Sequence, residues 1–427
     1  MEIKRDAYLN KLIRREHNGL VKIITGLRRS GKSYLLFNLF HQHLLDKGVK
    51  EDHIIEVALD NIKYKELRNP DKIFSYVEKR IVDEDLYYII LDEVQLLPEF
   101  VDVLNGFLHI KNADVYVTGS NSRFLSKDVV TEFRGRGGEI HVMPLSFSEF
   151  ITAYDGGVAE AWEDYYNYGG LPLILSWKEP EEKEAYLLSL FREVYLTDII
   201  ERHKIRNQEE FNELMDILSS SIGSLTNPLK LSKTFKSVKN KKISDMTIAR
   251  YIEYLEDAFL IKRAARYDVK GKKYIGSPSK YYFEDIGLRN ARLNFRQTEE
   301  NHIMENIIYN ELRYRDFLVD VGVIESIERD ESGKKVRKQY EIDFIATKGN
   351  LKFYIQSAFS MSSPEKILQE TNSLRHIPDS FKKIIVVREN KKPRMDENGF
   401  VTVGICQFCL MIRYCLDNEL RCLPLRI

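Results

Sequence analysis

The chain has 427 residues and a mass of 50.2 kDa, enough for about three domains of ordinary size. Lysine and arginine number 65, as do aspartate and glutamate, so the formal net charge is zero. Hydrophobic residues make up 43%, which is typical of globular proteins and excludes collagen-like, mucin-like or wholly disordered chains. Neutrality excludes a uniformly basic protein, but a whole-chain sum hides local excesses.

Neither a membrane segment nor a secretion signal is expected. No apolar run approaches the roughly 18 residues that span a bilayer, and the charged residues 1–6 have no apolar stretch behind them. Four cysteines are too few for a disulfide scaffold. The sequence therefore predicts a cytoplasmic protein.

Short apolar runs alternate with helix-like segments in the first third of the chain. The runs are residues 22–25, 54–59, 87–91 and 115–118. This alternation predicts an α/β domain over residues 1–150, with a parallel sheet and flanking crossover helices.

A phosphate-binding loop follows the first run. Residues 26–33 fit the Walker A pattern G-x-x-x-x-G-K-[ST] in full, and residues 34–40 read as the helix that the motif requires. The glycines let the backbone approach phosphate oxygens, while Lys32 supplies positive charge and Ser33 a ligand for Mg²⁺. The sequence therefore predicts binding of ATP and Mg²⁺ by Gly26, Leu27, Arg28, Arg29, Ser30, Gly31, Lys32, Ser33 and Tyr34.

Two carboxylates end the third apolar run. A buried parallel strand delivers its C-terminal residues to the ligand crevice of an open α/β sheet. Asp92 is therefore expected to bind Mg²⁺, directly or through water, and Glu93 to act as general base on the attacking water. The alternative is that the two carboxylates form an ordinary acidic turn at the surface. The phosphate loop in the same domain favours the magnesium site over this alternative.

Two further segments carry candidate catalytic groups. Ser120 and Asn121 follow the fourth run, where either could orient the water, although a simple turn fits equally well. Arg136, and after it Arg134, lies on a glycine-flanked corner from which a guanidinium could reach the nucleotide of a neighbouring subunit. A homo-oligomer follows if this arginine acts in trans; the alternative is an ordinary loop arginine.

These motifs resemble those of a known family. Together with residues 144–150, 168–172 and 282–289, they look like the prokaryotic AAA+ superfamily ATPases that carry a C-terminal domain of uncharacterised function. The resemblance covers nearly the whole chain. It implies ATP hydrolysis, but the later blocks identify the family without identifying a reaction.

The middle of the chain has a local charge excess. A helical connector is expected over residues 151–205, broken at 169–172. Between residues 227 and 275, thirteen Lys and Arg stand against five Asp and Glu, an excess of eight positive charges. The pattern resembles a winged helix, expected over residues 206–275, with helices at 229–238 and after Ser244, and strands within 261–275.

A winged helix suits double-stranded DNA, although such domains also bind proteins. The exposed candidates for contacts with phosphate are Lys236, Lys239, Lys241, Lys242, Lys272 and Lys273.

The last segment, residues 276–427, reads as mixed α/β and resembles the restriction-endonuclease-like PD-(D/E)xK fold. A helix at 302–312 precedes a hairpin whose strands cover 336–346 and 351–355. Glu305, Asp343 and Gln356 match the metal ligands of that fold, but Ala358 stands where its lysine belongs. We therefore expect a catalytically degenerate domain.

All four cysteines lie near the end, at Cys406, Cys409, Cys415 and Cys422. Their apolar surroundings and the spacing of the second pair favour core packing over a zinc site.

The sequence thus predicts a Mg²⁺-dependent ATPase that couples its nucleotide state to DNA. Two alternatives remain: an ATP-dependent switch for protein–protein interaction with little turnover, and an ATP-dependent nuclease, against which Ala358 argues.

Overall fold

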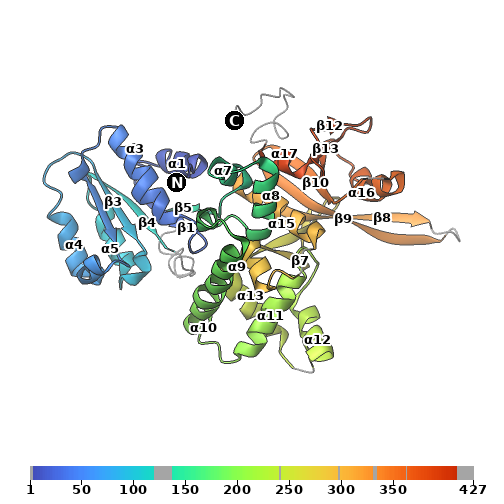
Figure 1. Cartoon of the computed structure of the whole chain (residues 1–427), viewed down its shortest axis with the longest axis horizontal. Coiled ribbons are helices and arrows are strands. Elements are labelled where there is room, and N and C mark those ends of the chain that lie inside the picture. The colour runs from blue at the N-terminus through green and yellow to red at the C-terminus, as the bar shows by residue number, and fades with distance from the viewer. Residues whose placement is uncertain are drawn as a thin grey trace. The chain divides into compact units, whose positions relative to one another are not determined.

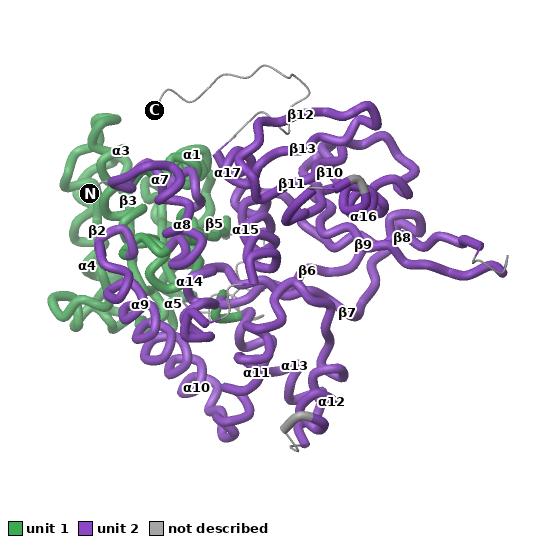
Figure 2. The backbone as a smooth tube through the Cα atoms, turned by 45° about the vertical axis from the view of Figure 1, so that its right-hand side comes forward, with its two compact units in different colours: residues 1–145, 171–173, 257–259 green, residues 146–170, 174–256, 260–427 purple. Residues whose placement is uncertain are grey.

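The computed structural model of the protein describes residues 3–119, 137–239, 242–296, 299–329, 334–361 and 363–410. It divides into two compact units (Figure 2). Unit 1 comprises Met1–Leu145, Leu171–Leu173 and Asp257–Phe259, and unit 2 comprises Ser146–Gly170, Ile174–Glu256 and Leu260–Ile427.

Unit 1 is built on a five-stranded parallel sheet (Figure 1). Its order is β2-β3-β4-β1-β5. The predicted parallel α/β sheet is confirmed, with one strand more than the sequence indicated. The strands are β1 (Val21–Thr25), β2 (Ile54–Ala58), β3 (Tyr87–Asp92), β4 (Ala113–Thr118) and β5 (Gly137–His141).

Helices cover both faces of this sheet because the strands are buried on both sides. Apolar side chains of α4 and α5 pack with Val21, Ile89 and Val117 on one face. Phe40 contacts the ring of Tyr116 on the other, with 4.5 Å between centroids. The helical segments are α1 (Asp6–Ile13), α2 (Lys32–Tyr34), the π-helical turn η1 (Leu35–Phe40), α3 (His41–Asp46), η2 (Glu51–His53), η3 (Ile62–Arg68), α4 (Pro70–Glu78), η4 (Val94–Leu96) and α5 (Phe100–Leu108).

Unit 2 contains most of the helices and a mixed sheet. The helical segments are α7 (Phe147–Thr152), α8 (Val158–Tyr168), η6 (Pro172–Ser176, of which the first two residues belong to unit 1), α9 (Pro180–Ser189), η7 (Leu190–Leu196), α10 (Thr197–His203), α11 (Gln208–Ser220), α12 (Pro228–Lys239), α13 (Asp245–Asp257), α14 (Ile286–Arg292), α15 (Glu300–Tyr314), α16 (Pro364–Arg375) and α17 (Ile405–Leu410). The residues expected to form helices at 229–238 and 302–312 do so, and Ser244 caps α13 by accepting the N–H of Thr247 at 3.0 Å.

The sheet of unit 2 has eight strands in the order β12-β13-β11-β10-β9-β8-β6-β7. The outer halves of β8 and β9 project from it as a two-stranded arm (Figure 1). The expected hairpin around Gly349 is confirmed, since β9 and β10 pair antiparallel there. The strands are β6 (Ile261–Asp268), β7 (Lys273–Phe283), β8 (Leu318–Arg329), β9 (Lys335–Lys348), β10 (Leu351–Ala358), β11 (Lys382–Val387), β12 (Arg394–Met395) and β13 (Phe400–Gly404).

Two further sequence expectations concern membrane-spanning segments and the cysteines. Across the residues described, no helix combines the length and apolar character needed to cross a membrane. Cys409 is fully buried and Cys406 partly so, and burial raises the pKa of both thiols. Cys415 and Cys422 lie outside the described residues.

Candidate functional site

The predicted nucleotide residues meet at one edge of the unit 1 sheet. Strand β1 ends at Thr25, β3 at Asp92 and β4 at Thr118. Because these strands are parallel and adjacent in the order β3-β4-β1, their C-terminal ends lie side by side. The sheet therefore brings the phosphate loop and the acidic pair together.

The phosphate loop connects β1 to α2, as the motif predicts. Leu27 and Ser30 are fully buried, whereas Arg28 and Arg29 are exposed. The two arginines thus face solvent, and Leu27 and Ser30 offer only their backbone to a ligand. Lys32 is 4% exposed, and its ammonium donates to the carbonyls of Gly26 (3.1 Å) and Leu27 (2.9 Å).

Two glycines give the loop its shape. Gly26 has a φ of 138°, and a Cβ built on it would lie 2.1 Å from the carbonyl oxygen of Val142. Gly31 has a φ of 94°, in the region that side chains disfavour. The loop therefore requires glycine at both positions, for close approach at Gly26 and for backbone conformation at Gly31.

Asp92 lies at the centre of the acidic edge and is 5% exposed. It accepts hydrogen bonds from the hydroxyls of Thr118 and Ser33. Burial raises the pKa of Asp92, and these two hydrogen bonds act in the opposite direction. The contact joins Ser33 of the phosphate loop to the acidic strand, which places the two expected Mg²⁺ ligands together.

Glu93 has a left-handed backbone conformation, with a φ of 52°. Its backbone N–H donates to the Thr118 hydroxyl at 3.0 Å, and its carboxylate accepts a hydrogen bond from the Gln95 amide. This backbone turns the chain away from the strand direction just after Asp92. Glu93 thus departs from the strand conformation that ends at Asp92.

The remaining predicted residues are Tyr34 and four residues of the segment 120–136. Tyr34 is half-buried in α2. Ser120, Asn121, Arg134 and Arg136 lie outside the described residues.

Comparisons with known proteins identify the family of this chain. Residues 18–151 match a family model described as an AAA domain, and residues 159–299 match one described as a domain of unknown function. An uncharacterised protein of Haemophilus influenzae is 32% identical over 390 residues, which cover 90% of this chain and 93% of the relative. This chain is an AAA-domain protein of the same family.

A second relative of this AAA-domain protein comes from an archaeon. It is an uncharacterised protein of Methanocaldococcus jannaschii, 30% identical over 377 residues that cover 84% of this chain and 77% of the relative. Among solved structures, a Walker-type ATPase of Pyrococcus abyssi aligns with 14% identity and a TM-score of 0.47, covering 68% of this chain and 96% of that one. The Aeropyrum pernix ORC1 protein in complex with DNA aligns with 14% identity and a TM-score of 0.28, covering 68% and 92%.

The basic segment of the AAA-domain protein lies in unit 2, on α12, α13, β6 and β7. Lys236, Lys242, Lys272 and Lys273 are exposed, and none forms an ion pair with another described residue. The side chains of Lys239 and Lys241 lie outside the described set. The strands differ slightly from expectation, because β7 begins at Lys273 and continues to Phe283.

The residues that match a nuclease site come together in part. Glu305 on α15 and Asp343 on β9 both contact the ammonium of Lys280, which the sequence did not single out. Burial, together with the charge of Glu305, raises the pKa of Asp343 to about 6. Gln356 accepts a hydrogen bond from Ser373 of α16 at 3.3 Å.

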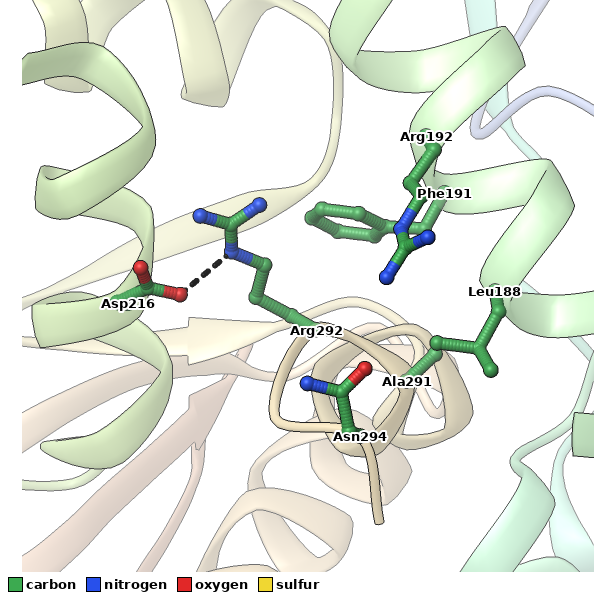
Figure 3. Close-up of a pocket in the computed structure, with 7 residues that line it drawn as sticks. All are labelled: Leu188, Phe191, Arg192, Asp216, Ala291, Arg292 and Asn294. Carbon is green, nitrogen blue, oxygen red and sulfur yellow. Dashed lines mark hydrogen bonds and ion pairs between the residues drawn. The ribbon is translucent and has the colours of Figure 1, made fainter. Parts of the chain in front are cut away.

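Unit 2 also contains a pocket of about 220 Å³ (Figure 3). The guanidinium groups of Arg192 and Arg292 face it, and Arg292 is paired with Asp216 at 2.8 Å. The remaining lining residues are Leu188, Phe191, Ala291 and Asn294. The Arg292 guanidinium also donates to the side chain and the carbonyl of Asn212, so its hydrogen bonds are made within the protein.

Sequence reasoning missed two supporting residues of the nucleotide site. Arg5 is 2% exposed and donates to the carbonyls of Ser30 (3.3 Å) and Met143 (2.7 Å), so it ties the phosphate loop to the segment after β5. Thr118 was placed on its strand, but its contact with Asp92 was not foreseen. The sequence signal for Thr118 is a polar residue at the end of an apolar strand, which does not by itself identify Asp92 as its partner.

Proposed function

We propose that unit 1 hydrolyses ATP with the help of Mg²⁺. The observation that carries the proposal is the hydrogen-bonded chain from Ser33 through Asp92 and Thr118 to the backbone of Glu93, beside the phosphate loop. It gathers a phosphate-binding cation, two metal-binding oxygens and a general base at one sheet edge, which is the set that phosphoryl transfer to water requires.

The phosphate loop binds the triphosphate. Backbone N–H groups of the loop and of the first turn of the helix that starts at Lys32 face the anion. Lys32 exchanges its carbonyl partners, Gly26 and Leu27, for phosphate oxygens when ATP enters. Its burial strengthens that electrostatic attraction, because little water screens it.

Ser33 and Asp92 fit a magnesium ion, since a hydroxyl and a carboxylate already contact each other there. When bound, Mg²⁺ supplies neutralisation of charge on the β- and γ-phosphate oxygens. Thr118 orients the Asp92 carboxylate by donating a hydrogen bond to it.

Glu93 accepts the proton of the attacking water on its carboxylate. Gln95 orients that carboxylate by donating a hydrogen bond to it. Replacing Glu93 by Gln removes the basic oxygen and leaves the backbone contact to Thr118 in place.

Steady-state phosphate release tests this proposal. Glu93→Gln is expected to lower kcat about 100-fold or more while ATP still binds, because general-base catalysis contributes about 10²–10⁴. Lys32→Ala is expected to abolish binding. Glu99→Gln and Lys79→Ala change exposed residues of unit 1 and serve as matched controls. Turnover in the Glu93→Gln chain equal to that of the parent would contradict the assignment.

Arg136 remains our choice for a residue acting in trans on the nucleotide of a neighbouring subunit. The Arg136→Ala and Glu93→Gln chains are each expected to lack turnover. Mixing them is expected to restore part of it, because some interfaces then combine an intact arginine with an intact base. A mixture as inactive as its components contradicts action in trans.

We further propose that ATP turnover is coupled to binding of double-stranded DNA by the basic segment. Its support is the excess of eight positive charges in residues 227–275, with Lys236, Lys242, Lys272 and Lys273 exposed. Such ammonium groups bind backbone phosphates and release counterions, which makes the affinity dependent on salt.

Fluorescence anisotropy of labelled duplex DNA over a salt series tests the coupling. Charge reversal of Lys236 and Lys242 together is expected to weaken binding and lower the slope of log K against log salt by about two. The pair Lys178→Glu and Lys392→Glu, at exposed sites elsewhere in unit 2, is the control. DNA is expected to stimulate the ATPase of the control but not of the test variant.

One observation favours a second candidate, a nucleotide-dependent switch that binds a protein. Leu229 on α12 and Met246 on α13 are 54% and 72% exposed and belong to the same basic segment. Exposed large apolar side chains are typical of protein contacts. Absence of both turnover and salt-dependent DNA binding would favour this candidate over the ATPase.

A further inference from the structure

One lysine lies among the carboxylates of the nuclease-like site in unit 2. The Lys280 ammonium is 2.8 Å from Glu305 Oε1, 2.8 Å from Glu341 Oε1 and 3.4 Å from Asp343 Oδ1. The lysine is 3% exposed. A buried ammonium therefore contacts carboxylates from two elements, α15 and β9, and comes itself from a third, β7.

A β-bulge follows directly after the pairing of Ile342 in β9. Asp320 pairs with Ile345 and Gly322 with Ile342, so Asp343 and Phe344 together lie opposite a single residue of β8. A bulge redirects the side chains of the strand that carries it. Ordinary alternation puts Asp343 on the same face as Glu341, since both contact Lys280. The bulge returns Ile345 to the face of Ile342, and both belong to one apolar cluster.

The PD-(D/E)xK resemblance implies a divalent cation between Glu305 and Asp343, but the residues present do not fit one. Mg²⁺ binds carboxylate oxygens at about 2.0–2.1 Å, which the ammonium among the same oxygens prevents. Ala358 belongs to a buried apolar cluster with Leu374. Gln356 is hydrogen-bonded to Ser373 of α16.

Access to the cluster is also restricted. Glu305 and Asp343 are 9% and 7% exposed. The Tyr282 hydroxyl donates to Glu305 at 2.5 Å, and a Cβ built on Gly223 would lie 3.1 Å from both Glu305 oxygens. Glu305 is therefore largely enclosed by the lysine, the tyrosine and the backbone near Gly223.

We propose that Lys280 takes the place of a metal ion: its ammonium closes the carboxylate cluster and ties β7 to α15 and β9. The C-terminal sheet is then a metal-independent module that does not cut DNA, and removal of the ammonium opens a site for a divalent cation. Removing one partner of a buried ion pair leaves uncompensated charge, so the cluster then gains from binding a cation.

Thermal unfolding of the full chain with and without Mn²⁺ tests this. All variants carry Asp92→Asn and no nucleotide is added, so that the ATPase site does not contribute. The parent is expected to show no Mn²⁺-dependent rise in Tm. Lys280→Met is expected to melt lower and to recover by several degrees with Mn²⁺. Lys280→Met with Glu305→Gln is expected to lose that recovery, and Lys178→Met to behave as the parent.

An equal response of the parent and the Lys280→Met chain to Mn²⁺ overturns the proposal, since the ammonium then does not exclude the metal. So does a Lys280→Met chain as stable as the parent. If Lys280→Met does not fold, the parent chain alone tests the proposal. Stabilisation by Mn²⁺ or nicking of supercoiled DNA refutes the proposal if that effect disappears in Asp343→Asn. Absence of both effects in the parent supports it.

Discussion

The Thr118 hydroxyl donates a hydrogen bond to the Asp92 carboxylate, and both residues end strands that are neighbours in the sheet. The same hydroxyl accepts the N–H of Glu93 at 3.0 Å. One uncharged side chain therefore positions both members of the acidic pair, and any shift between β3 and β4 disturbs both at once.

Replacing this hydroxyl is expected to slow hydrolysis without unfolding the chain. Thr118→Val keeps the shape of the side chain but leaves a buried carboxylate and a backbone N–H without this partner. A hydrogen bond to a charged group contributes about 1.5–3 kcal/mol, so we expect kcat to fall about ten- to a hundredfold. Thr118→Ser retains the hydroxyl and is expected to stay within a few-fold of the parent. Equal kcat in the Val and Ser variants would show that the contact is not needed.

The nucleotide site was predictable to the extent that its geometry is local. The phosphate loop depends on glycines and a lysine within residues 26–33, and Asp92 and Glu93 end an apolar strand that is recognisable by itself. Thr118 was not predictable as a partner of Asp92, because that contact depends on which strands are neighbours in the sheet.

The same reasoning explains the misses elsewhere. Strand β5 begins with Gly137 and Gly138, which have low strand propensity, and it forms because β1 offers a free edge. Lys280 lies between a proline and tyrosines in the sequence and gives no sign of its partners. Its contacts come from α15 and from the alternate residues Glu341 and Asp343 of β9, so only the assembled sheet reveals them.

A methyl group at Gly26 is expected to damage the phosphate loop. The Cβ would lie 2.1 Å from the Val142 carbonyl oxygen, so the loop or the segment after β5 has to move. We expect Gly26→Ala to weaken binding of a fluorescent ATP analogue more than tenfold and to lower Tm. Gly48 also has a positive φ, of 92°, but nothing lies within 4 Å of the carbon that Gly48→Ala adds. Gly48→Ala is expected to lower the free energy of unfolding by about 1–2 kcal/mol through backbone strain alone, with ATP binding unchanged. Equal ATP affinity in the two variants would contradict the steric argument.

Two blocks far apart in the sequence form one contact in unit 2. The Asp285 carboxylate accepts the backbone N–H of Gly170 at 2.8 Å and caps α14 by accepting that of Leu288 at 3.0 Å. A Cβ on Gly287 would lie 2.0 Å from the Tyr168 carbonyl oxygen. The sequence identified the segments 168–172 and 282–289 only as recurring family blocks. Their glycines and aspartate are explained by the close packing of the two segments on each other.

Asp285→Ala is expected to destabilise this contact by about 1–3 kcal/mol, since it removes a helix cap and a buried acceptor. Hydrogen exchange measured by mass spectrometry is expected to show faster exchange in peptides covering Gly170 and Leu288. Asp285→Asn keeps one carbonyl acceptor and is expected to have a smaller effect. Unchanged exchange in the alanine variant would mean that other contacts hold the two blocks together.

The stability of unit 2 is expected to depend on the protonation of His203. Its ring stacks on Tyr254, with 3.6 Å between centroids and 11° between planes. Burial, together with the charge of Arg202, lowers the pKa of His203 in the folded chain. In the unfolded chain the pKa of the histidine is about 6.5. As the pH falls through that value, the unfolded state therefore binds more protons than the folded state does. Acid therefore favours unfolding, and the stability that acid removes is recovered as the pH rises above about 6.5.

His203→Phe retains a ring for stacking on Tyr254 but has no titrating group. Its Tm is expected to change less between about pH 7.5 and pH 5.5 than that of the parent, with the difference confined to the transition of unit 2. His302→Gln removes a histidine that is one-third exposed and lies near Glu299, so it serves as the matched control and is expected to keep the parent's profile. A parent and a His203→Phe chain with the same pH profile would show that protonation at this ring is not linked to unfolding, because a depressed folded pKa has to appear as lost stability in acid.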